Sequence, residues 1–219
     1  MRARRLVVGA VGTVAATVGL IGMLHMPFAR GLLMRLGGCP VGNASLAEME
    51  PRRHEIVDKE RGATPAPARP ALGFTLDKTT HAELDAWAER SHVSCREERK
   101  ALVFCKDVPA AALGLPDVDG PVSEVHFGFD TKGTLFDVST IRNEATPRKA
   151  QEVESRLEAQ VGPPQQKSGS FDDAHLALAG IRSLASVSYK YRDYFAEVIA
   201  MRFQEGGLVV REHFMSAND

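Results

Sequence analysis

The sequence predicts an α+β protein, with an N-terminal transmembrane helix followed by a domain of two similar halves, each a helix plus an antiparallel sheet. Three observations predict this class. Residues 6–24 contain no charged side chain, two later segments begin with helix-capping threonines, and the short segments after each of them resemble strands. No part of the sequence names a reaction or a ligand.

The N-terminal apolar run is long enough to cross a bilayer. As a helix, residues 6–24 would span roughly 28 Å, close to the ~30 Å hydrocarbon core. Arg2, Arg4 and Arg5 precede the run, so the positive-inside rule places residues 1–5 in the cytoplasm and the body on the extracytoplasmic side, periplasmic or extracellular. A cleaved signal peptide is the alternative. We favour an uncleaved signal anchor because the run is longer than a signal peptide's apolar region and no A-x-A site follows directly.

Two segments separate this run from the expected domain. Residues 25–42 are predicted as a membrane-proximal segment that either lies along the membrane–water interface or forms an extended stalk. Residues 43–71 are heavily charged and then proline-rich, with three prolines in residues 64–70, which predicts a semi-rigid linker. The folded domain is therefore expected at residues 72–219, with halves at about 73–143 and 144–216.

The first of three cysteines, Cys39, ends the letters LGGC, a pattern similar to a bacterial lipobox. Against lipidation, 14 residues separate the apolar run from this thiol, and two arginines lie between them. Cys39 therefore stays a candidate for lipid attachment or an intermolecular disulfide, with a free thiol as the default. The dipeptide Cys39-Pro40 also matches a short haem-binding signature, but two residues are too little evidence, and we predict no cofactor.

Charge argues against a nucleic-acid-binding protein. The first 36 residues carry five arginines and no acidic residue, and subtracting these from 27 basic residues leaves 22 against 28 acidic ones, a net charge of −6. A nucleic-acid-binding protein gains affinity by neutralising phosphates and needs the opposite sign. The expected partners are instead the membrane, through residues 6–24, and another envelope protein.

The first half begins with a capping box. Thr80 and Glu83 have the Thr-x-x-Glu spacing, and Leu84 and Trp87 follow at helical spacing, which predicts a helix with one apolar face. Strands are then expected at residues 100–108, 123–130 and 134–142, with a hairpin turn at residues 130–133.

The second half repeats this order. Thr146-Pro147 is an N-cap followed by proline at the first helical position, and residues 148–162 place Ala150, Val153 and Leu157 on one face. Further elements are expected as a short helix at residues 173–185 and strands at 186–193, 194–204 and 208–215. Two helix-plus-three-strand halves indicate a duplication; the alternative is an α+β domain whose halves look alike by chance.

Cys95 and Cys105 lie at the end of the first helix and in the next strand. On the extracytoplasmic side oxidation is permitted, so we predict a disulfide between them. A zinc site with His81 and His92 is the weaker alternative, because the spacing matches no zinc finger. A redox-active dithiol would normally show C-x-x-C spacing, which is absent. We predict no metal site.

No nucleophile-elbow, zinc-protease, P-loop or dinucleotide-binding motif occurs, and we predict no catalytic residue and no enzymatic activity. Glu124, His126 and Glu197 are candidates for a polar cluster on the exposed side of a sheet. With Tyr194 they form the predicted interaction surface, since exposed aromatic residues anchor protein contacts. Tyr189 and Tyr191 share a face with Val187, so we predict core packing for both.

The Thr-capped helix "TTHAELDAW", the Cys95–Cys105 pair and a second Thr-started helix ending in "VGPP" together resemble the exported α+β domains of the β-lactamase inhibitor protein and its BamE-like (SmpA/OmlA) relatives. The resemblance covers residues 73–215. It implies a tandem repeat of helix plus antiparallel sheet, and an open sheet face that binds another protein. It transfers no functional residue.

The function expected from these observations is a membrane-tethered extracytoplasmic binding or interaction module, of unknown ligand and not an enzyme. One alternative is an envelope lipoprotein or structural scaffold lipidated at Cys39. The other is an enzyme of unrecognised type, which would use Glu124, His126 and Glu197 in a pocket.

Overall fold

The computed structural model describes residues 46–99, 101–115, 120–144, 146–176, 183–203 and 207–218. Residues from Leu46 to Asp219 form one compact unit. Its helices are α3 (Leu46–Glu60), α4 (His81–Arg90), the 3-10 helix η2 (Ala110–Leu113), α5 (Pro147–Val161) and α6 (Asp173–Leu176). Its strands are β1 (Cys95–Arg99), β2 (Leu102–Pro109), β3 (Pro121–Phe129), β4 (Leu135–Glu144), β5 (Gln166–Ser168), β6 (Ser183–Lys190), β7 (Tyr194–Arg202) and β8 (Leu208–Ser216).

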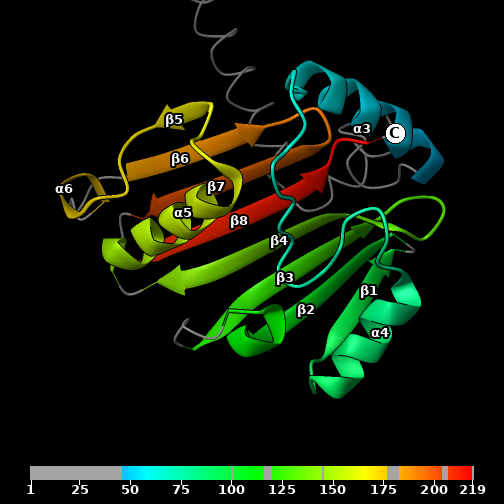
Figure 1. Ribbon diagram of the computed structural model, residues 1–219. Coiled ribbons are helices and arrows are strands. Elements are labelled where there is room, and N and C mark those ends of the chain that lie inside the picture. The colour runs from blue at the N-terminus through cyan, green and yellow to red at the C-terminus, as the bar shows by residue number, and fades with distance from the viewer. Residues whose placement is uncertain are drawn as a thin grey trace, which may run out of the picture. The chain divides into compact units, whose positions relative to one another are not determined.

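All these strands belong to one antiparallel sheet of eight strands, in the order β1-β2-β3-β4-β8-β7-β6-β5 (Figure 1). The chain fills the sheet from one edge through β4 and from the other edge through β8. These two strands then pair over eight residues, from Asp137 opposite Met215 to Glu144 opposite Leu208. The centre of the sheet is thus a contact between segments about 70 residues apart.

The predicted fold class, a transmembrane helix plus a domain of two helix-and-sheet halves, is wrong. The domain is mainly a single eight-stranded sheet with few short helices, because β4 and β8 join all strands into one ladder. No helix in the described ranges combines the length and apolar composition needed to cross a membrane. The predicted anchor at residues 6–24 lies outside the described residues, as do residues 1–5, residues 25–42 and Cys39.

Both capping predictions locate a helix correctly. The Thr80 hydroxyl accepts a hydrogen bond from the Glu83 amide, and the Glu83 carboxylate accepts one from the Thr80 amide, so the capping box is complete. Pro147 occupies the first turn of α5 after the N-cap Thr146. Four apolar residues of α5 are buried, and each such valine or leucine contributes about 2 kcal/mol; they are Ala150, Val153, Leu157 and Val161.

The two faces of the sheet differ. On β8, Val210, Glu212 and Phe214 are buried beneath the layer that contains α4 and α5, and we call this side the helical face. Alternate residues such as His213 point to the other side, the open face. Figure 1 shows α5 in front of β6, β7 and β8. At the other end of the helical face, the ring of Trp87 from α4 lies 5.8 Å from that of Phe127 on β3.

The segment that joins α3 to α4, residues 62–79, crosses the helical face between α4 and α5 (Figure 1), and we call it the strap. It includes most of the proline-rich stretch predicted as a linker, yet its backbone is bonded to the sheet. The Gly62 amide donates to Tyr191 O at 3.2 Å, and the Asp77 amide donates to Leu135 O at 2.8 Å. A Cβ at residue 62 would lie 2.1 Å from the Lys190 carbonyl oxygen, so only glycine permits this approach.

The strand predictions hold for β2, β3, β4, β6, β7 and β8, with ends shifted by a few residues. Of the helix predicted at residues 173–185, the structure shows α6, and the prediction is wrong at residues 183–185; residues 177–182 lie outside the described residues. Ser183 opens β6, where eight residues pair with β7 and bury Ala185, Val187 and Tyr189 on the helical face. Pairing and burial along this ladder outweigh the helix propensity of the alanine-rich stretch.

The predicted disulfide is present. Cys95 of β1 and Cys105 of β2 are directly opposite each other, with their Cα atoms 4.1 Å apart. Cys105 is fully buried beside the core, so the bond holds the edge strand β1 on the sheet.

Reducing this disulfide should lower the free energy of unfolding. Closing a loop of ten residues removes about 3 kcal/mol of chain entropy from the unfolded state. Urea unfolding with and without reductant measures the difference. The Cys39→Ala variant should show the same difference, because Cys39 is not part of the Cys95–Cys105 pair. Equal stability of the oxidised and reduced proteins would contradict the prediction.

The domain should lose stability in acid, because the stabilising contribution of the Asp77 carboxylate disappears on protonation. Burial alone would raise the pKa of this carboxyl, but hydrogen bonds from Ser216, Arg69 and Asn218 outweigh it and lower the pKa below 3.8. The carboxylate therefore stabilises the fold above the unfolded pKa of about 4, and the contribution disappears as the pH falls through the folded-state value. Asp77→Asn should lower the melting temperature at pH 7 and approach the unmodified protein at pH 2.5. An identical difference at both pH values would refute this.

Candidate functional site

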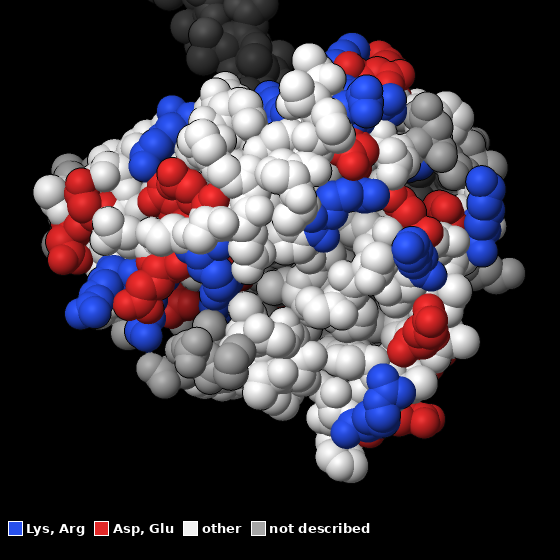
Figure 2. All heavy atoms as spheres, in the orientation of Figure 1, with Lys and Arg blue, Asp and Glu red and all other residues white. Residues whose placement is uncertain are grey.

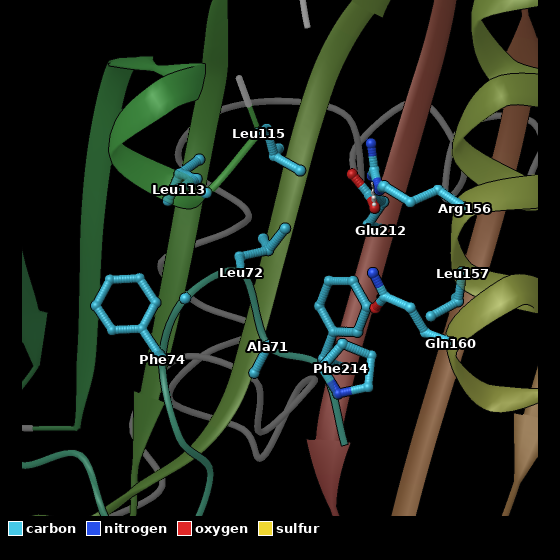
Figure 3. Close-up of a pocket in the computed structure, with 13 residues that line it drawn as sticks. Ala71, Leu72, Phe74, Leu113, Leu115, Arg156, Leu157, Gln160, Glu212 and Phe214 are labelled. Atoms are coloured by element: carbon cyan, nitrogen blue, oxygen red, sulfur yellow. Dashed lines mark hydrogen bonds and ion pairs between the residues drawn. The ribbon is translucent and has the colours of Figure 1, made fainter. Parts of the chain in front are cut away.

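The helical face contains a pocket between the strap, η2 and α5, with a volume of about 290 Å³. Figure 3 shows Leu72 and Leu115 on one side, Arg156 and Gln160 of α5 on the other, and β8 behind them. Figure 2, which views the same face, shows a mostly uncharged middle with charged side chains around it. The lining residues are Pro70, Ala71, Leu72, Gly73, Phe74, Leu113, Gly114, Leu115, Arg156, Leu157, Gln160, Glu212 and Phe214.

A tight turn of the strap forms one wall. The Phe74 amide donates to Ala71 O at 3.0 Å, and the two residues between them have positive φ values, 55° at Leu72 and 82° at Gly73. A buried leucine in the left-handed region is strained by roughly 1–2 kcal/mol. This turn, where an extended strap would continue straight on, places the Leu72 side chain against the pocket.

A buried ion network forms the floor. Glu212 is 1% exposed, and its two carboxylate oxygens accept separate bonds, from Arg142 Nη2 at 2.5 Å and Arg156 Nη2 at 2.6 Å. Arg142, itself 3% exposed, also lies 3.8 Å from Glu144. Burial raises the pKa of the Glu144 carboxyl, although the charges of Arg142 and Lys149 oppose the shift. The network thus joins β4, β8 and α5 beneath the pocket.

Sequence reasoning missed this site. Glu212 lies in the alternating stretch of β8 on the same face as Val210 and Phe214, and a charged residue at an apolar position is a signal that was available. Its partners were not predictable from the pattern, because Arg142 and Arg156 are 70 and 56 residues away in the chain.

The predicted polar cluster is on the open face, and the structure divides it. Glu124 and His126 form a pair on β3, with His126 Nε2 3.2 Å from Glu124 Oε2. Glu197 lies on β7, and β4 and β8 separate it from that pair. Its direct neighbour is His213 of β8, which is hydrogen-bonded to Asp137 of β4. The predicted residues therefore belong to two separate clusters, and neither lines the pocket.

Ser139 occupies the position between the two histidines, opposite His126 on one side and His213 on the other. In the part of the chain that the structure describes, its hydroxyl makes no hydrogen bond to either imidazole, so we assign no nucleophile there. Within the same ranges, no group of three or more potential ligands is placed to hold a metal ion.

Tyr194 does not belong to an interaction surface. It is fully buried, its hydroxyl donates to Pro70 O at 2.7 Å, and burial raises the pKa of that hydroxyl. The side chain holds the strap on the sheet instead. Tyr189 and Tyr191 also lie in the core, as the shared face with Val187 predicts.

Comparison with known proteins found no match among family models, curated proteins or solved structures. The resemblance to the β-lactamase inhibitor protein and its BamE-like relatives therefore stays a prediction.

Glu212→Gln should destabilise the domain by about 3 kcal/mol, because it leaves two guanidinium groups without their shared carboxylate and one of them is buried. Chemical denaturation measures this loss. The matched control is Glu124→Gln, which removes a carboxylate from a more exposed contact with His126 on the open face and should change stability by less than about 1 kcal/mol. If both variants lost the same free energy of unfolding, the network would contribute no more to stability than the contact on the open face.

Proposed function

We propose that the unit from Leu46 to Asp219 is a non-enzymatic binding module of an extracytoplasmic compartment, and that it takes a small ligand into the pocket between the strap and α5. The observation that carries this proposal is the preformed pocket, with apolar side chains on its walls and an ion network at its base.

Apolar cavities with a few convergent polar groups are the usual form of small-ligand sites. Here the apolar contacts come from Leu72, Leu115 and Phe214, among others, and the polar groups come from Arg156 and Gln160. The volume of about 290 Å³ is at the small end of the range for ligand pockets. A strained Leu72 on the wall is a further sign, because backbone strain of this kind persists at functional sites.

The disulfide supports the location. A stable bond between Cys95 and Cys105 requires an oxidising compartment, whereas thiols in the cytosol are kept reduced. The network under the pocket supports a binding role, because it holds α5 and β8 in fixed positions and so preforms the cavity before a ligand arrives.

Filling the pocket should abolish ligand binding. Ala71→Phe adds a phenyl ring to a buried wall position, whereas Ala159→Phe adds the same ring at an exposed position of α5 outside the lining. Ligand-observed NMR with neutral and charged fragments of about ten non-hydrogen atoms, roughly the number that the cavity holds at 30 Å³ each, measures binding.

Fragments should bind the unmodified protein and Ala159→Phe, and the affinity should fall at least tenfold in Ala71→Phe. If no fragment binds the unmodified protein, or if both variants bind equally well, the pocket is not the binding site. A circular dichroism spectrum checks that both variants are folded.

A further inference from the structure

The charges at the pocket floor distinguish between classes of ligand. Both oxygens of Glu212 already accept a hydrogen bond from a guanidinium group, so this carboxylate has little negative charge to offer a cation. Arg156 donates to Glu212 from Nη2 alone, and in the described part of the chain the structure shows no other partner for its guanidinium. A guanidinium has five N–H donors, so Arg156 keeps donors for a ligand.

The position of Arg156 makes these donors accessible. Its side chain is 31% exposed, whereas that of Glu212 is 1% exposed, so the cation lies between the carboxylate and the cavity. One turn further along α5, the exposed Gln160 contributes an amide at the same rim. An arginine with an adjacent amide suits a planar anion such as a carboxylate, which accepts paired hydrogen bonds.

Apart from Glu212, the other side chains of the lining are apolar. Leu72, Leu115 and Leu157 are each at most 7% exposed, and Phe214 lies on the floor between the strap and α5 (Figure 3). The volume of about 290 Å³ equals that of roughly ten water molecules at about 30 Å³ each, so a ligand of about ten non-hydrogen atoms can enter it. The side chains of these walls offer no hydrogen-bonding group, so a polar ligand body would lose bonds to water on entry that only backbone groups could replace.

We propose that the pocket binds a small amphipathic carboxylate, with its apolar chain between the strap and α5 and its carboxylate on Arg156 and Gln160. This inference rests on the proposed function and adds the chemical class of the ligand. The size and polarity of octanoate, which has eight carbons and two oxygens, fit the site.

The test compares three probes that share an eight-carbon chain: octanoate, 1-octanol and octylammonium. Binding to the full chain at pH 7 is measured by calorimetry and by the fluorescence of Trp87. This residue is the single tryptophan, and its ring lies 5.0 Å from that of the pocket residue Phe74. Octanoate should bind at least tenfold more tightly than 1-octanol, and octylammonium should bind most weakly.

Two variants of α5 assign the carboxylate contact. Arg156→Gln should weaken octanoate binding at least tenfold and leave 1-octanol binding within twofold, because it removes a charge-assisted hydrogen bond that only the carboxylate makes. Arg148→Gln removes the same charge from an exposed position on the same helix, and should leave both affinities unchanged. Since Arg156 also pairs with Glu212, Gln160→Leu provides a second variant that spares the network. It should weaken octanoate binding about threefold relative to 1-octanol.

The outcomes separate the two proposals. If none of the three probes binds, the pocket fails as a ligand site and the carboxylate assignment fails with it. If octanoate and 1-octanol bind equally well and Arg156→Gln affects neither, the pocket binds ligands but the carboxylate assignment is wrong. Tightest binding of octylammonium would also overturn it. If Arg156→Gln does not fold, an unchanged preference for octanoate in Gln160→Leu overturns the proposed contact.

Discussion

The paired carboxylate of Glu212 is the interaction on which the arrangement of the helical face depends. It lies on β8 at the seam where the two sets of four strands meet, and it binds Arg142 on the partner strand β4 and Arg156 on α5. Burying an ion costs several kcal/mol, which is offset only when its hydrogen-bonding groups are satisfied. This requirement fixes the position of α5 over β8, and with it one wall of the pocket.

The width of the sheet is a second constraint, and the strap satisfies it by covering part of the helical face. Eight strands present a helical face that α4, with 10 residues, and α5, with 15 residues, cannot cover together. The strap fills the space between α4 and α5, held by Tyr194 and by backbone bonds to the β6–β7 turn and to the start of β4. A strap packs less continuously than a helix, and the pocket lies where its turn at Leu72 meets η2 and α5. The cavity is thus a consequence of how the wide sheet is covered.

Local signals predicted most elements, and their failures have physical causes. The capping box at Thr80 acts within four residues, so the start of α4 was readable from the sequence. The edge strands were missed because β1 consists mainly of charged residues and β5 has three exposed residues, so neither shows alternation of apolar and polar positions. The candidate site was missed for a different reason: its groups come from the strap, η2, α5 and β8, and no local pattern records their convergence.

The sequence by itself determined the starts of α4 and α5, the alternation of most strands, the hairpin at residues 130–133 and the disulfide, because each depends on residues close together in the chain. Only the tertiary structure decided that β4 pairs with β8, that the proline-rich stretch packs on the sheet, and that Glu124 and Glu197 lie apart. These outcomes depend on contacts between residues up to 147 positions apart, as between Arg69 of the strap and Ser216 of β8. Such contacts are selected by burial and charge pairing over the whole unit, which a local pattern does not encode.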